Sequence, residues 1–146
     1  MKLYFCINKQ PLNGYVNINL ATQRVDFSNL NTLCEAAECT EMILDDVLEY
    51  LPLQTIPDIL VKLITRLRKK GKIVIHNLDI NETIKQYTNG LTSVADLNLM
   101  LYGHNQANKC SAFSHVDLHD ILVTNGLQIV SIELLSNSFT IIAQRI

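Results

Sequence analysis

Residues Glu41 to Asn77, which read EMILDDVLEYLPLQTIPDILVKLITRLRKKGKIVIHN, decide the fold of this 146-residue chain. A short apolar run, Glu41 to Leu44, precedes an acidic turn, Asp45-Asp46. An amphipathic pattern follows, and a second apolar run, Lys72 to Asn77, closes the stretch. Strand, helix and strand in this order predict a βαβ unit, and a connection of this length favours parallel pairing of the two strands.

The helix between these strands has clear start and stop signals. Apolar residues recur at the spacing that places them on one helix face. These residues are Ile56, Ile59, Leu60, Leu63, Ile64 and Leu67. Thr55 is predicted to cap the first turn together with Asp58. The cations from Arg66 to Lys70 suit the C-terminal end of a helix dipole, and Gly71 is predicted to end the helix in a left-handed conformation.

The flanking segments extend this unit on both sides. Apolar strands are predicted at 3–7 and 15–20, and taken alone the short link between them suggests a hairpin. A third short strand is expected at 24–26, and helices are expected at 28–38, 79–87, 93–101 and from the Ser114 cap to Gly126. Strands at 127–135 and 138–145 are predicted to form an antiparallel hairpin. The chain is therefore expected to be a single α/β domain, 1–146, with a Rossmann-like open twisted sheet, mostly parallel with an antiparallel C-terminal strand, and helices on both faces.

Composition restricts the function classes. The chain is 48% hydrophobic, enough for a sizeable core, and its net charge of -2 argues against a general nucleic-acid binder. Its four cysteines form no Cys-x-x-Cys pair, and no apolar run is long enough to span a bilayer. Polar residues interrupt the first apolar run too early for a secretory leader. We therefore expect a cytoplasmic protein with free thiols and no membrane partner.

The order of motifs resembles the second half of class I S-adenosylmethionine-dependent methyltransferases. Leu48-Glu49-Tyr50-Leu51-Pro52 is similar to the leucine-glutamate-histidine-leucine phrase that precedes a helix in that family, with Tyr50 in place of histidine. Lys70-Gly71-Lys72 stands where the family has a proline-glycine-glycine turn. The C-terminal pattern, Leu118 to Gly126 followed by two strands, is similar to the family's last helix and its closing sixth and seventh strands. The N-terminal strands resemble a compact branch of the family, and this implies that they pair in parallel.

The resemblance implies S-adenosylmethionine as cofactor, held by residues at the carboxyl ends of the strands. The implied cofactor-binding residues are Phe5, Cys6, Ile7, Asn8, Asn19, Leu20, Asp26, Leu44 and Asp45. Cys6 and Asn8 replace two glycines of the family, and Asn19 replaces the acidic residue that accepts bonds from the ribose hydroxyls. Losing one hydrogen bond to a charged group, worth roughly 1.5–3 kcal/mol, weakens binding by about ten- to a hundredfold. The cofactor site is therefore expected to be degenerate.

Polar residues after the central strands are candidates for the chemistry, because ligands of open α/β sheets bind outside the carboxyl ends of the strands. The candidate catalytic residues are Asp46, Glu49 and His76, and the candidate substrate-binding residues are Tyr50, Asn77, Tyr102 and His104. Asp45-Asp46 is equally interpreted as a solvated turn, Glu49 as a surface carboxylate and His76 as a structural histidine. His115 and His119 have a metal-binding spacing but no third ligand, so no metal site is predicted.

Two functions follow as alternatives. The first is a methyltransferase with a rebuilt first loop that acts on an unidentified small-molecule substrate. The second is a non-catalytic binding or assembly module that forms a homo-oligomer or sits beside a partner protein. An unrelated nucleotide-binding domain is less favoured, because the chain has no glycine-rich phosphate loop.

Overall fold

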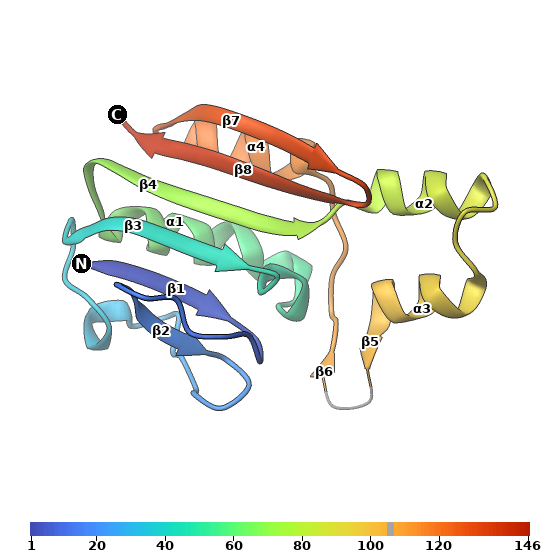
Figure 1. The fold of residues 1–146 in the computed structure, drawn as a ribbon. Helices are drawn as coiled ribbons and strands as arrows, with labels where there is room; N and C mark the ends of the chain where they lie inside the picture. The colour runs from blue at the N-terminus through green and yellow to red at the C-terminus, as the bar shows by residue number, and fades with distance from the viewer. Residues whose placement is uncertain (105–106) are drawn as a thin grey trace.

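The computed structural model describes residues 1–104 and 107–146, without the side chains of 104 and 107 (Figure 1). Its strands are β1 (Lys2–Cys6), β2 (Val16–Asn19), β3 (Cys39–Asp45), β4 (Leu67–Leu78), β5 (Gly103–His104), β6 (Ala107–Asn108), β7 (Leu127–Leu135) and β8 (Ser138–Arg145). Its α-helices are α1 (Ile56–Arg66), α2 (Ile80–Thr88), α3 (Val94–Tyr102) and α4 (His115–Thr124). Three 3-10 turns are η1 (Leu30–Thr32), η2 (Leu48–Tyr50) and η3 (Leu53–Thr55). None of the helices in these residues is long and apolar enough to cross a bilayer.

The described strands form one main sheet in the order β2-β1-β3-β4-β8-β7, and β5 pairs with β6 separately. The first four strands of the main sheet run parallel, and β8 is antiparallel to both of its neighbours. This confirms the predicted mostly parallel α/β sheet with an antiparallel C-terminal strand. The chain leaves β1 toward β2 and then returns to β3 on the other side of β1. The strand order therefore reverses at β1, where open α/β sheets place their ligands.

The predicted βαβ unit is present as β3, α1 and β4, with one correction at its basic segment. α1 ends at Arg66, and the cations that follow belong to β4. Lys70 takes the positive φ (62°) that was expected of Gly71. A Cβ on Gly71 would lie 2.9 Å from the carbonyl oxygens of Arg68 and Cys39, so glycine is needed there for close backbone packing. Thr55 makes no side-chain cap, because its hydroxyl donates to the Pro52 carbonyl.

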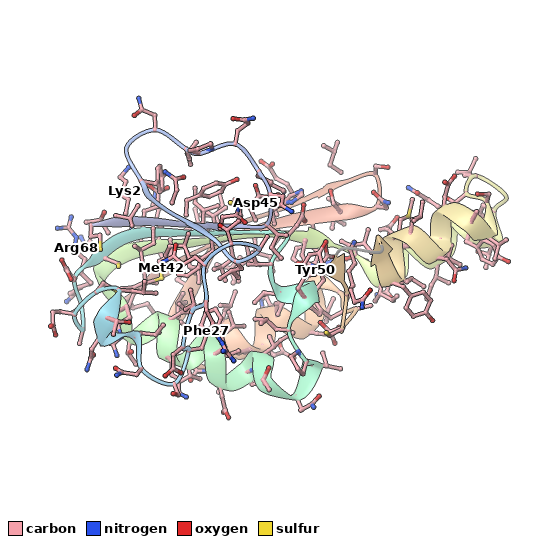
Figure 2. All side chains as sticks on the ribbon, turned by 90° about the horizontal axis from the view of Figure 1, so that it is seen from below. Lys2, Phe27, Met42, Asp45, Tyr50 and Arg68 are labelled. Carbon is pink, nitrogen blue, oxygen red and sulfur yellow. The ribbon has the colours of Figure 1, made fainter. Side chains whose placement is uncertain are left out.

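The two faces of the sheet are covered differently. Figure 1 shows α1 and α4 behind the sheet, and Figure 2, turned by 90°, shows them below it with the connection between β1 and β2 above. Successive side chains of each strand point to opposite faces of the sheet. On the face toward the helices the central strands carry fully buried apolar residues, namely Phe5, Leu44, Ile75 and Ile141. In the described residues, the opposite face carries the β1–β2 connection rather than a helix, and we call it the open face.

The N-terminal segment departs from the expected elements. β1 and β2 pair in parallel, with Leu3 opposite Val16, which confirms the pairing that the family resemblance implied and not the hairpin that the short link suggests on its own. Residues 24–26 form no strand, because the Asp26 carboxylate accepts from the amide and hydroxyl of Ser28 and turns the chain. The predicted helix 28–38 is reduced to η1. The Asn29 side chain accepts from the Asn31 amide there and competes with helical bonding.

The C-terminal half follows the sequence closely. Asp79 and Ser93 cap α2 and α3, and Ser114 and Asp117 form the expected capping box of α4. Gly126 ends the following turn with a φ of +83°. β7 and β8 have the predicted bounds. α2 and α3 project from the end of the sheet near the β7–β8 turn (Figure 1).

Candidate functional site

A cavity of about 470 Å³ lies at the carboxyl ends of β1 and β2. It is open to solvent and bordered by the segment after β1, the segment after β2, the η2 turn with Leu51, and β6. Its lining residues are Ile7, Asn8, Leu20, Ala21, Gln23, Arg24, Val25, Phe27, Tyr50, Leu51 and Asn108. We call it the strand-end cavity. Figure 2 places Phe27 on the side of the sheet that the helices cover.

Asn8 lines this cavity and is held in place by Asn19, which lies behind it in β2. Asn8 has a φ of +52°, so it takes a conformation that glycine adopts readily. Its amide donates to the Asn19 side-chain oxygen at 3.0 Å, and the Ala21 amide donates to the same oxygen at 3.1 Å. An amide oxygen has two lone pairs. The acceptor that was assigned to the ribose hydroxyls is therefore already bonded to two backbone amides.

The nine residues predicted to bind the cofactor lie in three places. Ile7, Asn8 and Leu20 line the strand-end cavity. Phe5, Cys6 and Leu44 are buried in the strands, where Phe5 packs against Phe27 with ring centres 6.4 Å apart. The remaining three, Asn19, Asp26 and Asp45, are polar and do not line it. Asp26 borders a neighbouring hollow, and hydrogen bonds from the hydroxyl and amide of Ser28 lower its carboxyl pKa.

Asp45, Asp46 and His76 form an ion cluster with Lys9 at the ends of β3 and β4. Lys9 Nζ lies 2.5 Å from Asp45 Oδ1 and 2.7 Å from Asp46 Oδ2. His76 Nδ1 lies 3.0 Å from Asp46 Oδ1 and 3.4 Å from Asp45 Oδ1. The Tyr4 hydroxyl donates to Asp45 Oδ2 at 2.7 Å. Lys9 comes from the β1–β2 connection, so the cluster ties that connection to the open face.

The charges in this cluster shift one another's pKa. Hydrogen bonds with Asp45 and then Asp46 raise the pKa of His76 from 6.5 to about 9. Hydrogen bonds from His76, Lys9 and Tyr4 hold the pKa of Asp45 well below its usual range, against the opposing effect of burial. Burial and the bond to Asp45 raise the pKa of Tyr4 to about 12. His76 is therefore a cation at neutral pH, where it balances a carboxylate and does not accept a proton.

The geometry of Asp45, Asp46 and His76 also resembles a metal site, since their ligand atoms lie within 4.8 Å of one another. The Lys9 ammonium touches both carboxylates of this group. Two carboxylates and two cations are electrically balanced without a metal ion. His115 and His119 have different partners. His115 bonds to buried Asp79 at 2.9 Å, and His119 bonds to Asp120.

The pKa of His76 gives a prediction for stability against pH. A group whose folded-state pKa is raised stabilises fully below its ordinary pKa of 6.5, and this stability is lost as the pH rises through about 9. We expect chemical denaturation of the wild type to show a decline in stability across this window. His76→Gln should remove that decline, so that the two proteins differ most below pH 6.5 and least above pH 9. His119→Gln, on an exposed face of α4, should keep the wild-type profile; an unchanged profile in His76→Gln would contradict the assignment.

Glu49 is held by a second ion pair, on the η2 turn. Its side chain is 5% exposed and lies 3.1 Å from Lys109 Nζ, whose own side chain is 14% exposed. Lys109 also donates to the Met100 carbonyl at 2.8 Å. Burial raises the pKa of Glu49, and the nearby Lys109 charge partly offsets this effect. Glu49 is the one candidate base whose pKa moves toward neutrality, and it adjoins the cavity through Tyr50.

The candidate substrate-binding residues are scattered. Tyr50 lines the strand-end cavity. Asn77 is buried on the helix-covered face, and its side-chain oxygen has no hydrogen-bond partner among the described residues. Tyr102 is 64% exposed beside a smaller hollow of about 230 Å³. The side chain of His104 lies outside the described residues.

Several residues of the site were not singled out from the sequence. Lys9 and Lys109 pair with carboxylates 36 and 60 positions away. Gln23, Arg24 and Asn108 line the cavity from irregular segments. The one available signal was the position of Lys9 and Gln23, each a few residues after a predicted strand. No periodicity marks such residues, because their partners are set by the sheet order.

No family model and no curated protein matches this chain. Solved structures do resemble it. A protein described as a S-adenosylmethionine-dependent methyltransferase of Methanosarcina mazei has a TM-score of 0.61 at 14% identity, covering 99% of this chain and 82% of that chain. An O-methyltransferase family protein of Burkholderia thailandensis has a TM-score of 0.60 at 14% identity over 90% of this chain. Magnesium protoporphyrin IX methyltransferase of Synechocystis, solved with bound S-adenosylhomocysteine, has a TM-score of 0.52 at 17% identity over 90% of this chain. This chain spans only 36% and 51% of the last two proteins.

Proposed function

We propose, from the class I methyltransferase fold of this chain, that it is a methyltransferase-like protein that binds an S-adenosyl nucleoside in the strand-end cavity. The observation that carries the proposal is the position of the cavity, at the carboxyl ends of the strands where the strand order reverses. Its volume of about 470 Å³ suits a small-molecule ligand. Ile7, Asn8 and Leu20, which the sequence resemblance assigns to the cofactor, all line it.

The lining suits a nucleoside. Apolar groups of Ile7, Val25 and Phe27 offer surface for a flat purine base, and base stacking on aromatic rings is favourable. The amides of Gln23 and Asn108 offer both donors and acceptors for the edge of the base.

Charge supports weak binding of the methyl donor. Among the described lining residues, Arg24 carries the one formal charge, and it is positive. S-adenosylmethionine carries a positively charged sulfonium where S-adenosylhomocysteine has a neutral sulfide, and both molecules carry the same ammonium and carboxylate groups. Asp45 and Asp46 already pair with Lys9 and His76. We therefore expect S-adenosylhomocysteine to bind at least as tightly as S-adenosylmethionine.

A non-catalytic binding module is the second candidate, and the state of the proposed bases favours it. His76 is protonated at neutral pH, because its pKa is about 9. The pKa of Asp46 is lowered; burial opposes the shift, but bonds from His76 and Lys9 outweigh it. General bases work best with a pKa near the operating pH, and among the three candidates only the pKa of Glu49 moves toward it.

Calorimetric titration tests the proposal. We expect the wild type to bind S-adenosylhomocysteine with micromolar affinity. Ala21→Trp fills the cavity from an exposed lining position and should weaken binding by at least tenfold. Ala36→Trp, at an exposed position that does not line the cavity, is the matched control and should bind as the wild type does. No heat with millimolar ligand, or equal binding by Ala21→Trp, would overturn the proposal. A methyl-transfer assay would then separate the enzyme from the binding module.

A further inference from the structure

The two edges of the main sheet are built differently. β2, at one edge, is four residues long, and the side chain of its own Asn17 bonds to the amide and carbonyl of Leu12. β7, at the other edge, is nine residues long and pairs only with β8 in the described part of the chain. Edge strands expose unpaired N–H and C=O groups, and monomeric proteins protect long ones with lysine, proline or a cover.

β7 has few of these protections. Its sequence LQIVSIELL contains no proline and no cation, and Glu133 is its one charged residue. Several of its apolar side chains are exposed to solvent: Val130 is 53% exposed, Leu134 is 53% exposed and Leu135 is 77% exposed. One protective feature is present, a bulge between Ile129 and Ser131, but it leaves the run from Ser131 to Leu135 in regular register with β8.

We propose that β7 pairs with β7 of a second copy of this chain, in antiparallel orientation about a twofold axis at Ile132. The open N–H and C=O groups require a strand as partner, and a second copy supplies one of matching length. With Ile132 opposite itself, Ser131 faces Glu133 across the interface, within the part of β7 that is in regular register. A register centred on Glu133 would instead oppose two carboxylates, which is unfavourable.

In this register apolar residues meet on one face of the sheet and polar residues meet on the other. Ile132 and Leu134 lie opposite Ile141 and Phe139 of β8, so they are on the helix-covered face. The cross-strand partner of Ile132 is Ile132 of the second copy, which lies on the same face, since antiparallel neighbours point to the same side. Ser131 and Glu133 lie on the open face, opposite Ile142 and Thr140. The strand-end cavity lies near the opposite edge of the sheet, at β1 and β2, so a dimer formed through β7 leaves it free.

Sedimentation velocity and cross-linking test the dimer in two steps. The wild type is expected to sediment at twice the chain mass of 16.5 kDa at micromolar concentration. Ile132→Lys should give a monomer, because it buries a charge at the centre of the interface. Leu91→Lys, at a position 78% exposed between α2 and α3, should remain a dimer.

Cysteine variants then test the register, in a Cys110→Ser background because Cys110 is the exposed native thiol. Oxidised Ile132→Cys should form a covalent dimer, since the two residues face each other. Glu133→Cys should not, because its own copy lies diagonally at about 8 Å between Cα atoms, beyond disulfide reach. A monomeric wild type, a dimer that survives Ile132→Lys, or equal cross-linking of both variants would overturn the proposal. Pairing of β7 with a different protein would leave the purified chain monomeric and would also count against it.

Discussion

Lys109→Met is expected to lower the free energy of unfolding by about 3–5 kcal/mol, because it leaves the buried Glu49 carboxylate without its partner. Glu49 is 3% exposed, and its backbone carbonyl also accepts the amides of Cys110 and Ser111. The ion pair therefore joins the η2 turn, which borders the cavity, to the segment that follows β6. The expected loss is large because relaxation around Glu49 is restricted by these backbone bonds.

The loss of stability in Lys109→Met should depend on pH in a defined direction. The pKa of Glu49 is already raised by burial, and removal of Lys109 raises it further. A raised pKa gives stability that is present below the ordinary value of 4.5 and lost as the pH increases. The destabilisation by Lys109→Met should thus be greatest at neutral pH and shrink toward pH 4.5.

Urea denaturation measures this effect, with two controls. Glu49→Gln combined with Lys109→Met should recover a large part of the loss, since no buried charge remains. Lys85→Met removes an exposed pair with Glu82, 3.2 Å apart, and should cost at most about 0.5 kcal/mol. A loss below about 1 kcal/mol for Lys109→Met would show that the pair is solvated and that our account of η2 is wrong.

Phe139→Ala should be equally destabilising, by about 3–5 kcal/mol, because it opens a cavity in the centre of the core. Phe139 is fully buried on β8, with the rings of Phe113 and His115 centred 6.4 and 6.1 Å away. Those two residues flank the Ser114 cap, so the variant should also loosen the start of α4.

Tyr87→Ala serves as the aromatic control, because Tyr87 is 40% exposed on α2. We expect it to cost no more than about 1 kcal/mol under the same urea denaturation. Comparable losses in the two variants would contradict the packing described for the sheet and α4.

The fold could largely be predicted because its main elements are specified locally. The central βαβ unit has helical periodicity between two apolar runs, and the C-terminal hairpin has clear strand alternation. The parallel pair β1–β2 was not specified in this way. Its connection of nine residues is shorter than most parallel crossovers, and local patterns alone favoured a hairpin. Parallel pairing depends on β1 being a central strand with neighbours on both sides.

The site was less predictable, for a related reason. Asp45, Asp46 and His76 were expected together because they follow neighbouring parallel strands, and the sheet does bring them into contact. Their neutralisation by Lys9 depends on the path of the β1–β2 connection over the open face. The role of Asn19 in bonding two backbone amides likewise depends on loop conformation, which residue type alone does not determine.

Methyl-resolved NMR during titration with S-adenosylhomocysteine tests the central claim, ligand binding in the strand-end cavity, most directly. We predict saturable shifts for the methyl groups of Ile7, Leu20, Val25 and Leu51, which line the cavity. Leu91 and Leu135, which are exposed far from it, should not move. Unchanged cavity methyl signals at millimolar ligand, or shifts confined to other parts of the protein, would contradict the account.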